Sequence, residues 1–129
     1  MVTVKKIMSK DIQKVDGEIT IKEAAKVMKT KKIGCLLVEK DKVIIGIVTE
    51  TDIVRRLIAE GKDPESTQVK IIMSSPLITI DAGKSIINAN DMMDKNNIRH
   101  LAVKEDNIII GVVSSRDMMR PLYMEGEEW

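Results

Sequence analysis

The fold is decided by a stretch that reads IGCLLVEKDKVIIGIVTETD at residues 33–52 and returns as IRHLAVKEDNIIIGVVSSRD at residues 98–117. The offset of 65 residues holds beyond this stretch: residues 4–57 align with residues 69–122 without a gap, and 20 of the 54 pairs are identical. What the chain does must therefore come from the repeat, from the pairing of its copies or from the differences between them. We divide the chain into repeat 1 (1–60), a polar linker (61–68), repeat 2 (69–124) and an acidic tail (125–129).

The composition limits the class of protein. Apolar residues make up 43% of the chain, aromatic residues only 2%, and phenylalanine is absent, so we expect a core of Ile, Val, Leu, Met and Ala. Half of the chain would be marginal as an independent domain, and we therefore expect the two repeats to share a core. The net charge of +1 lacks the excess of positive charge that nucleic-acid binding needs, so no nucleic-acid partner is expected.

Three further features bear on the cellular compartment. Cys35 is the single cysteine, which excludes an internal disulfide and fits a reducing environment. Residues 1–6 contain no apolar signal region, and no apolar run approaches the length of a membrane span. We therefore expect a cytoplasmic protein without a membrane partner.

Each repeat predicts the order strand, helix, strand, strand, helix. An apolar stretch opens repeat 1 at residues 12–15, and Thr20 with Glu23 then has the spacing of a capping box at the start of a helix. Two β-branched runs follow at residues 35–38 and 43–48, and the four polar residues between them predict the turn of an antiparallel hairpin.

The last predicted element of each repeat is a second helix. It is expected to begin at Thr49 in repeat 1 and at Ser114 in repeat 2, and Gly61 is placed to end the first of these helices. Solenoid repeats normally need three or more units, so two units more plausibly close on each other. The predicted fold class is α+β, with two β-α-β-β-α repeats packed about an approximate twofold axis.

The strongest candidate for chemistry lies where the hairpin meets the second helix. Thr49 precedes Asp52 by three residues, and Ser114 precedes Asp117 in the same way. One interpretation is a capping box, in which the hydroxyl and the carboxylate satisfy backbone amides. The other is a nucleotide cradle, because a helix start attracts phosphate and an ionised carboxylate can accept bonds from both hydroxyls of a ribose.

Glycines lie just upstream of both candidate sites. Gly46 and Gly111 each precede the hydroxyl residue by three positions. A glycine within a strand allows another chain segment or a ligand to approach the backbone closely. Both explanations stay open at this point.

These patterns together resemble the CBS domain, named after cystathionine β-synthase. The resemblance rests on residues 98–103 and 110–117 in repeat 2, on residues 33–38 and 46–52 in repeat 1, and on the Ile-Met-Ser segments at 7–9 and 72–74. It covers residues 4–122, and two tandem copies are similar to a complete Bateman module.

The resemblance implies a ligand and its binding residues. Paired CBS domains form two clefts that commonly hold adenosyl ligands such as AMP, ADP, ATP or S-adenosylmethionine. The family's ribose-binding aspartate falls on Asp52 and Asp117, and its neighbouring hydroxyl on Thr49 and Ser114. The base would lie against residues 10–12 with 33–35 in one cleft and residues 75–77 with 98–100 in the other. These lining residues include Ile33, Cys35, Pro76, Ile98 and His100.

The two repeats differ in their cations. Repeat 2 has Arg99, His100, Arg116 and Arg120 where repeat 1 has Gly34, Cys35, Thr51 and Arg55. Arginine suits phosphate through its planar set of donors, so we expect the site of Asp117 to be the better one for a phosphorylated nucleotide. The alternative is that Arg116 and Arg120, four residues apart, decorate a solvated helix face.

Catalysis and metal binding are not expected. Cys35 and His100 occupy equivalent positions, and we interpret them as ordinary strand residues, with His100 lining a cleft. One cysteine and one histidine form a poor zinc set, and no nucleophile–base pair is visible.

The functional hypothesis is a stand-alone regulatory module that senses an adenosyl nucleotide and signals to an unidentified protein effector. The resemblance further implies a homodimer. The alternative is a structural or dimerisation module whose clefts are empty.

Overall fold

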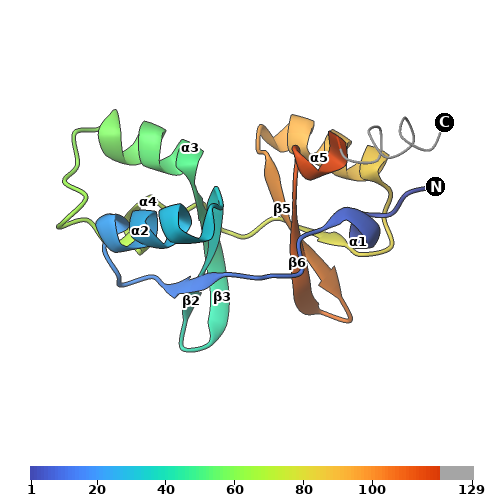
Figure 1. The fold of residues 1–129 in the computed structure, drawn as a ribbon, viewed down its shortest axis with the longest axis horizontal. Coiled ribbons are helices and arrows are strands. Elements are labelled where there is room, and N and C mark those ends of the chain that lie inside the picture. Colours follow the sequence, from blue (N-terminus) through green and yellow to red (C-terminus); the bar gives the residue numbers. More distant parts are fainter. Residues whose placement is uncertain (120–129) are drawn as a thin grey trace. The chain divides into compact units, whose positions relative to one another are not determined.

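Two three-stranded sheets organise the chain in the computed structural model, which describes residues 1–119 (Figure 1). The first sheet contains β1 (Lys14–Asp16), β2 (Cys35–Lys40) and β3 (Val43–Thr49), and the second contains β4 (Thr79–Asp81), β5 (His100–Glu105) and β6 (Ile108–Ser114). In each sheet the first strand pairs in parallel with the second, and the second pairs with the third as an antiparallel hairpin. The predicted α+β class, the hairpins and the two repeats are confirmed. Arg120 and the acidic tail lie outside the described residues.

The two long helices, α2 and α5, begin directly after the residues that were predicted to cap them, Thr20 and Ser85. In α2 (Ile21–Lys31), the Thr20 hydroxyl accepts a bond from the Glu23 amide at 3.2 Å, and the Glu23 carboxylate accepts one from the Thr20 amide at 3.2 Å. In α5 (Ile86–Asn96), Ser85 forms the same arrangement with the side chain of Asn88. The predicted capping box at Thr20 is therefore confirmed, and so is the cap at Ser85.

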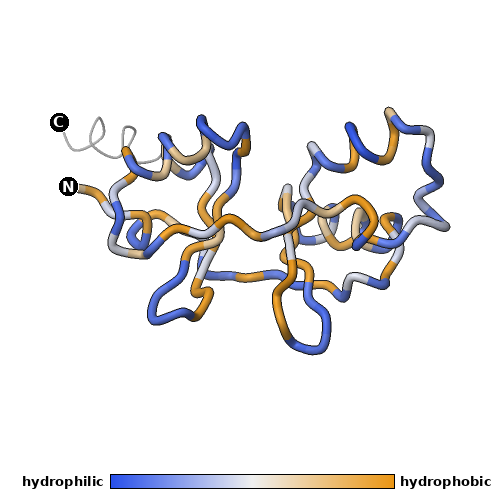
Figure 2. The backbone as a smooth tube through the Cα atoms, turned by 180° about the vertical axis from the view of Figure 1, so that it is seen from behind, coloured by the Kyte–Doolittle hydropathy of each residue, from blue (hydrophilic) through white to orange (hydrophobic). Residues whose placement is uncertain are grey.

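The hairpin turns are shorter than predicted. The strands extend through residues 39 and 40, and the turn consists of Asp41 and Lys42, both with positive φ. Asp106 and Asn107 form the equivalent turn in repeat 2. Two central residues with positive φ match the right-handed twist of a hairpin, so two residues suffice where four were expected. Figure 2 shows these turns as hydrophilic segments at the ends of more hydrophobic strands.

The second helix differs between the repeats. In repeat 1, α3 (Glu50–Asp52) continues into a π-helical segment, Ile53–Ile58, and Gly61 follows it with a φ of 68°, as expected for a residue that ends a helix. In repeat 2, the described residues contain one 3₁₀ turn, Asp117–Met119.

Two one-turn helices that the sequence did not predict precede the Met-Ser segments. They are α1 (Val4–Ile7) and α4 (Val69–Ile72). The chain divides into two compact units: the first-sheet unit, Gln13–Leu77, and the second-sheet unit, Met1–Ile12 together with the chain from Ile78 onward. Each repeat therefore contributes its opening segment to the sheet of the other repeat, and Figure 1 shows α1 beside β6.

This exchange explains why both repeats contain a Met-Ser segment and a glycine, Gly46 or Gly111, in the last strand of the hairpin. Ser74 exchanges two backbone hydrogen bonds with Ile47, at 2.7 and 3.0 Å, and Ser9 exchanges two with Val112, at 2.8 and 3.0 Å. A Cβ atom at Gly46 would lie 2.7 Å from the Ser74 carbonyl oxygen. The glycine is thus needed because a chain segment crosses the strand there.

Each unit has its own hydrophobic core, and each core contains residues of both repeats. Val69 and Ile72 of repeat 2 are buried among the residues of the first core, together with Leu36 and Leu57. Val4 of repeat 1 is fully buried in the second core. The expected single shared core is therefore replaced by two cores that the opening segments complete.

Candidate functional site

The predicted site residues gather at one end of each sheet. Cys35 lies opposite Thr49 in the pairing of β2 with β3, and the Glu50 amide donates a 3.0 Å bond to the Gly34 carbonyl. The beginning of β2 therefore lies beside the start of α3.

The second-sheet unit repeats this arrangement. His100 lies opposite Ser114, and the Ser115 amide donates a 2.9 Å bond to the Arg99 carbonyl. The predicted residues of this unit are Ile98, Arg99, His100, Ser114, Arg116 and Asp117.

The base-lining residues that the resemblance groups together belong to different units. Pro76 is exposed on the segment between α4 and β4 in the first-sheet unit, whereas Ile98 and His100 belong to the second-sheet unit. Likewise, residues 10–12 belong to the second-sheet unit, whereas Ile33 and Cys35 belong to the first. Neither unit by itself assembles the base site that the resemblance implies.

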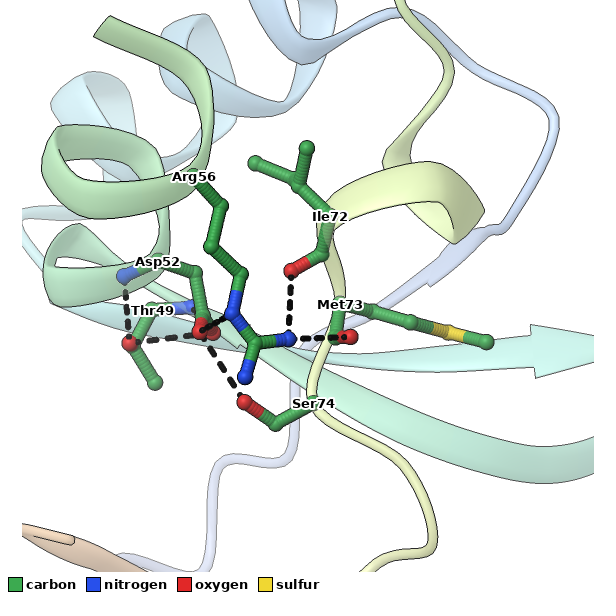
Figure 3. A network of polar contacts seen from close by, with 6 residues as sticks. All are labelled: Thr49, Asp52, Arg56, Ile72, Met73 and Ser74. Atoms are coloured by element: carbon green, nitrogen blue, oxygen red, sulfur yellow. Dashed lines mark hydrogen bonds and ion pairs between the residues drawn. The ribbon is translucent and has the colours of Figure 1, made fainter. Parts of the chain in front are cut away.

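Asp52 is buried and its carboxylate is engaged by neighbouring side chains (Figure 3). Its Oδ2 atom accepts bonds from the Thr49 amide at 3.0 Å and from the Thr49 hydroxyl at 3.2 Å. Its Oδ1 atom accepts a bond from the Ser74 hydroxyl at 2.9 Å and lies 3.7 Å from Nε of Arg56. The capping-box interpretation is confirmed for Thr49 and Asp52, and two further side chains extend it.

Arg56 links this aspartate to the opening segment of repeat 2. One terminal nitrogen of its guanidinium donates to the carbonyl oxygens of Ile72, at 3.3 Å, and of Met73, at 3.0 Å. We call Asp52, Arg56 and Ser74 the latch (Figure 3). The sequence motif does not indicate a role for Arg56 or Ser74; the available signal is that Arg56 aligns with Pro121, where the two repeats differ.

Asp117 has the capping box without the latch. Its Oδ2 atom accepts a 2.9 Å bond from the Ser114 amide, and its own amide donates a 3.1 Å bond to the Ser114 hydroxyl. Within residues 1–119, its Oδ1 atom has no hydrogen-bond partner, and the residue is only partly buried. Ser9 aligns with Ser74, but its bonds to Val112 are backbone bonds.

The two units also differ in charge at the residues aligned with Gly34 and Glu50. In the first-sheet unit, the Glu50 carboxylate lies where a side chain at Gly34 would begin. In the second-sheet unit the aligned residues are Ser115 and Arg99, and the neighbouring Arg116 is also exposed. Across the described part of the chain, neither Arg99 nor Arg116 forms an ion pair. Arg116 directly precedes Asp117 in sequence, and Arg99 is joined through its carbonyl to Ser115, two residues before Asp117.

Residues 1–119 contain neither a candidate metal site nor a candidate membrane span. No three side chains of His, Cys, Asp or Glu gather there in a way that could hold a metal ion. None of the helices there has both the length and the apolar character needed to cross a membrane.

Comparison with known sequences gives a consistent result. A family model of the CBS domain matches residues 4–59 and 68–123. The CBS domain-containing protein YhcV of Bacillus subtilis is 32% identical over 118 residues, which cover 92% of this chain and 84% of YhcV. The mitochondrial CBS domain-containing protein CBSX3 of Arabidopsis thaliana is 35% identical over 114 residues, and the chain spans only 55% of its length.

Solved structures share the fold over nearly the whole chain. A candidate signal-transduction protein with CBS domains from Burkholderia ambifaria has a TM-score of 0.91 at 28% identity and is covered to 96%, as is this chain. A hexameric CBS-CP12 protein from bloom-forming cyanobacteria has a TM-score of 0.85 at 30% identity, covering 92% of this chain and 70% of that one. The chain therefore belongs to the CBS-domain family and carries two CBS domains in tandem.

Proposed function

We propose that the chain is a regulatory module that binds an adenosyl nucleotide at Asp117 and transmits the bound state to a partner protein. The observation that carries this proposal is the Oδ1 atom of Asp117, which has no hydrogen-bond partner among residues 1–119, in a unit that also exposes Arg99 and Arg116. S-adenosylmethionine is the alternative ligand, and we propose no catalytic step.

The chemistry of the site matches the parts of such a nucleotide. A ribose offers two hydroxyl donors, and a carboxylate with one available oxygen can accept them while its other oxygen still caps the Ser114 amide. Arg99 and Arg116 supply planar cationic donors for phosphate. In the first-sheet unit, Gly34 and Thr51 align with these two arginines, and Arg56 is already paired with Asp52. The Glu50 carboxylate beside Gly34 adds a negative charge that opposes a phosphate group.

Regulation places a second requirement on the ligand. A nucleotide shifts an equilibrium between two states only if it binds one state more tightly than the other. The structural relative described as a candidate signal-transduction protein supports a signalling role for this chain.

Isothermal titration of the full chain with AMP, ADP, ATP and S-adenosylmethionine tests the binding step. We expect Asp117→Asn to weaken nucleotide binding at least tenfold, because an amide accepts through only one oxygen. Asp52→Asn is the matched control and should leave the affinity unchanged. The proposal fails if none of the four compounds binds, or if Asp52→Asn alone abolishes binding.

A second candidate function is assembly. Val54 and Ile58, four residues apart on the same helical segment, are 60% and 63% exposed, and Ile71 of α4 is 59% exposed. Exposed large apolar residues favour a protein interface where they form a patch, and one structural relative is a hexamer. Native mass spectrometry with and without AMP tests a homodimer; a monomer at micromolar concentration would exclude it.

A further inference from the structure

We infer that the latch closes the first-sheet unit to nucleotide, so that each chain binds one nucleotide rather than two. This inference rests on the proposed function of Asp117, and it assigns to Arg56 and Ser74 the role of setting the stoichiometry.

The first argument is the use of lone pairs on Asp52. Both carboxylate oxygens already accept hydrogen bonds, one from Ser74 and the other twice from Thr49. The residue is 6% exposed and Ser74 already uses one lone pair of Oδ1, so a ribose that donates both hydroxyls to this oxygen would have to displace the Ser74 hydroxyl. Asp117, by contrast, keeps Oδ1 available among the described residues.

The second argument is the position of Arg56. Its guanidinium bridges the Asp52 carboxylate to the carbonyl oxygens of Ile72 and Met73, so the charge of the aspartate is balanced from within the unit (Figure 3). A nucleotide that donated to Asp52 would compete with Arg56 at Oδ1, and a shift of the guanidinium would weaken its bonds to the carbonyl oxygens of Ile72 and Met73.

The third argument is that the latch cannot be built in repeat 2. The residue aligned with Arg56 is Pro121, which has neither a guanidinium nor a backbone N–H group. The two aspartates have the same sequence motif, yet only Asp52 has an arginine one helical turn away at the fourth position.

The fourth argument is independent of hydrogen bonding. The Glu50 carboxylate occupies the space where a side chain at Gly34 would begin, just before β2. The residue aligned with Gly34 in repeat 2 is Arg99. The charge of Arg56 is balanced by Asp52, so a phosphate approaching this aspartate would meet the further negative charge of Glu50. At the position that aligns with Gly34, repeat 2 offers the positive charge of Arg99 instead.

The test is the number of AMP molecules bound per chain, measured by isothermal titration and by native mass spectrometry. We expect one per wild-type chain and none for Asp117→Asn at the same concentration. Adding Arg56→Ala and Ser74→Ala to Asp117→Asn should restore binding, with an affinity at least tenfold above that of Asp117→Asn alone. A further Asp52→Asn change should remove the restored site.

Control variants separate the latch from general effects of mutation. Arg55→Ala removes a neighbouring exposed arginine outside the latch and should restore nothing in the Asp117→Asn background. Ser74→Ala alone keeps the backbone bonds to Ile47, so it serves as the second variant if the double change does not fold, and it should restore a smaller fraction of binding.

The outcomes distinguish the two proposals. Two equivalent AMP molecules per wild-type chain would overturn the latch and leave the nucleotide function intact. A restored site that never appears in the latch variants would also overturn the latch. No binding by wild type, with binding gained on removing the latch, would refute the role of Asp117 and support the latch.

Discussion

Replacing Gly111 by alanine tests why the opening segments require a glycine beneath them. The new Cβ atom would lie 2.7 Å from the Ser9 carbonyl oxygen and 2.5 Å from the Met8 sulfur. The flexible methionine can turn away, but Ser9 is held by two backbone bonds to Val112. An ordinary carbon–oxygen contact is about 3.3 Å or longer, so the segment must move by roughly 0.6 Å.

The cost follows from that displacement. Overpacking of this kind typically costs about 1–3 kcal/mol, and each weakened backbone bond adds about 1 kcal/mol. Alanine also lowers the conformational entropy of the unfolded chain, which by itself would raise the free energy of unfolding by about 0.4–1 kcal/mol. We therefore expect Gly111→Ala to lower the free energy of unfolding by about 2–4 kcal/mol.

Urea denaturation followed by circular dichroism measures this change against a matched control. Gly83 lies in the same unit, no atom lies within 4 Å of a Cβ built there, and its φ is not positive. Gly83→Ala should be neutral or should gain up to about 1 kcal/mol. If Gly111→Ala and Gly83→Ala have the same unfolding free energy within about 0.5 kcal/mol, the close-approach explanation is wrong.

Three further substitutions test packing, capping and backbone strain by the same denaturation assay. Leu57 is 1% exposed, and Leu57→Ala should lower the free energy of unfolding by about 2–5 kcal/mol because it leaves a cavity in the core. Ile58 is 63% exposed, and Ile58→Ala should change that free energy by less than about 0.5 kcal/mol. Similar losses for the two variants would contradict the assigned core. Thr20→Ala removes the cap of α2 and should cost about 1 kcal/mol; an unchanged midpoint would argue against the capping box. Lys32 ends α2 in the left-handed region with φ 57°, so Lys32→Gly should raise the free energy of unfolding by up to about 1 kcal/mol. Asn97→Gly should raise it less, because asparagine tolerates that region. A larger gain for Asn97→Gly than for Lys32→Gly would refute the strain argument.

Local patterns account for most of what could be predicted. Thr20 and Glu23 are three residues apart, and their reciprocal bonds depend on nothing distant. The hairpins were equally predictable, because two β-branched runs and a short polar turn are close in sequence. The turn length was overestimated because Asp41 and Lys42 adopt positive φ without the glycine that usually announces it.

Long-range contacts account for what could not be predicted. The four-residue helices α1 and α4 are too short for a periodic pattern, and their exchange between the sheets is set by tertiary packing. The latch joins Asp52 to Ser74 across 22 residues, and no local spacing indicates that pair. As a result, two aspartates that are equivalent in sequence differ in the number of bonds that their carboxylates accept from residues 1–119.

The exchange of opening segments has a consequence for polypeptides that contain a single repeat. Such a polypeptide would form one sheet, and the segment that crosses β3 at Gly46 would have to come from a second molecule. Its assembly would then depend on protein concentration, as for any obligate pair. In the tandem chain the linker keeps the two segments at a high effective concentration, so both units are completed at any dilution. Gene fusion would in this way convert a bimolecular exchange into a step of monomer folding.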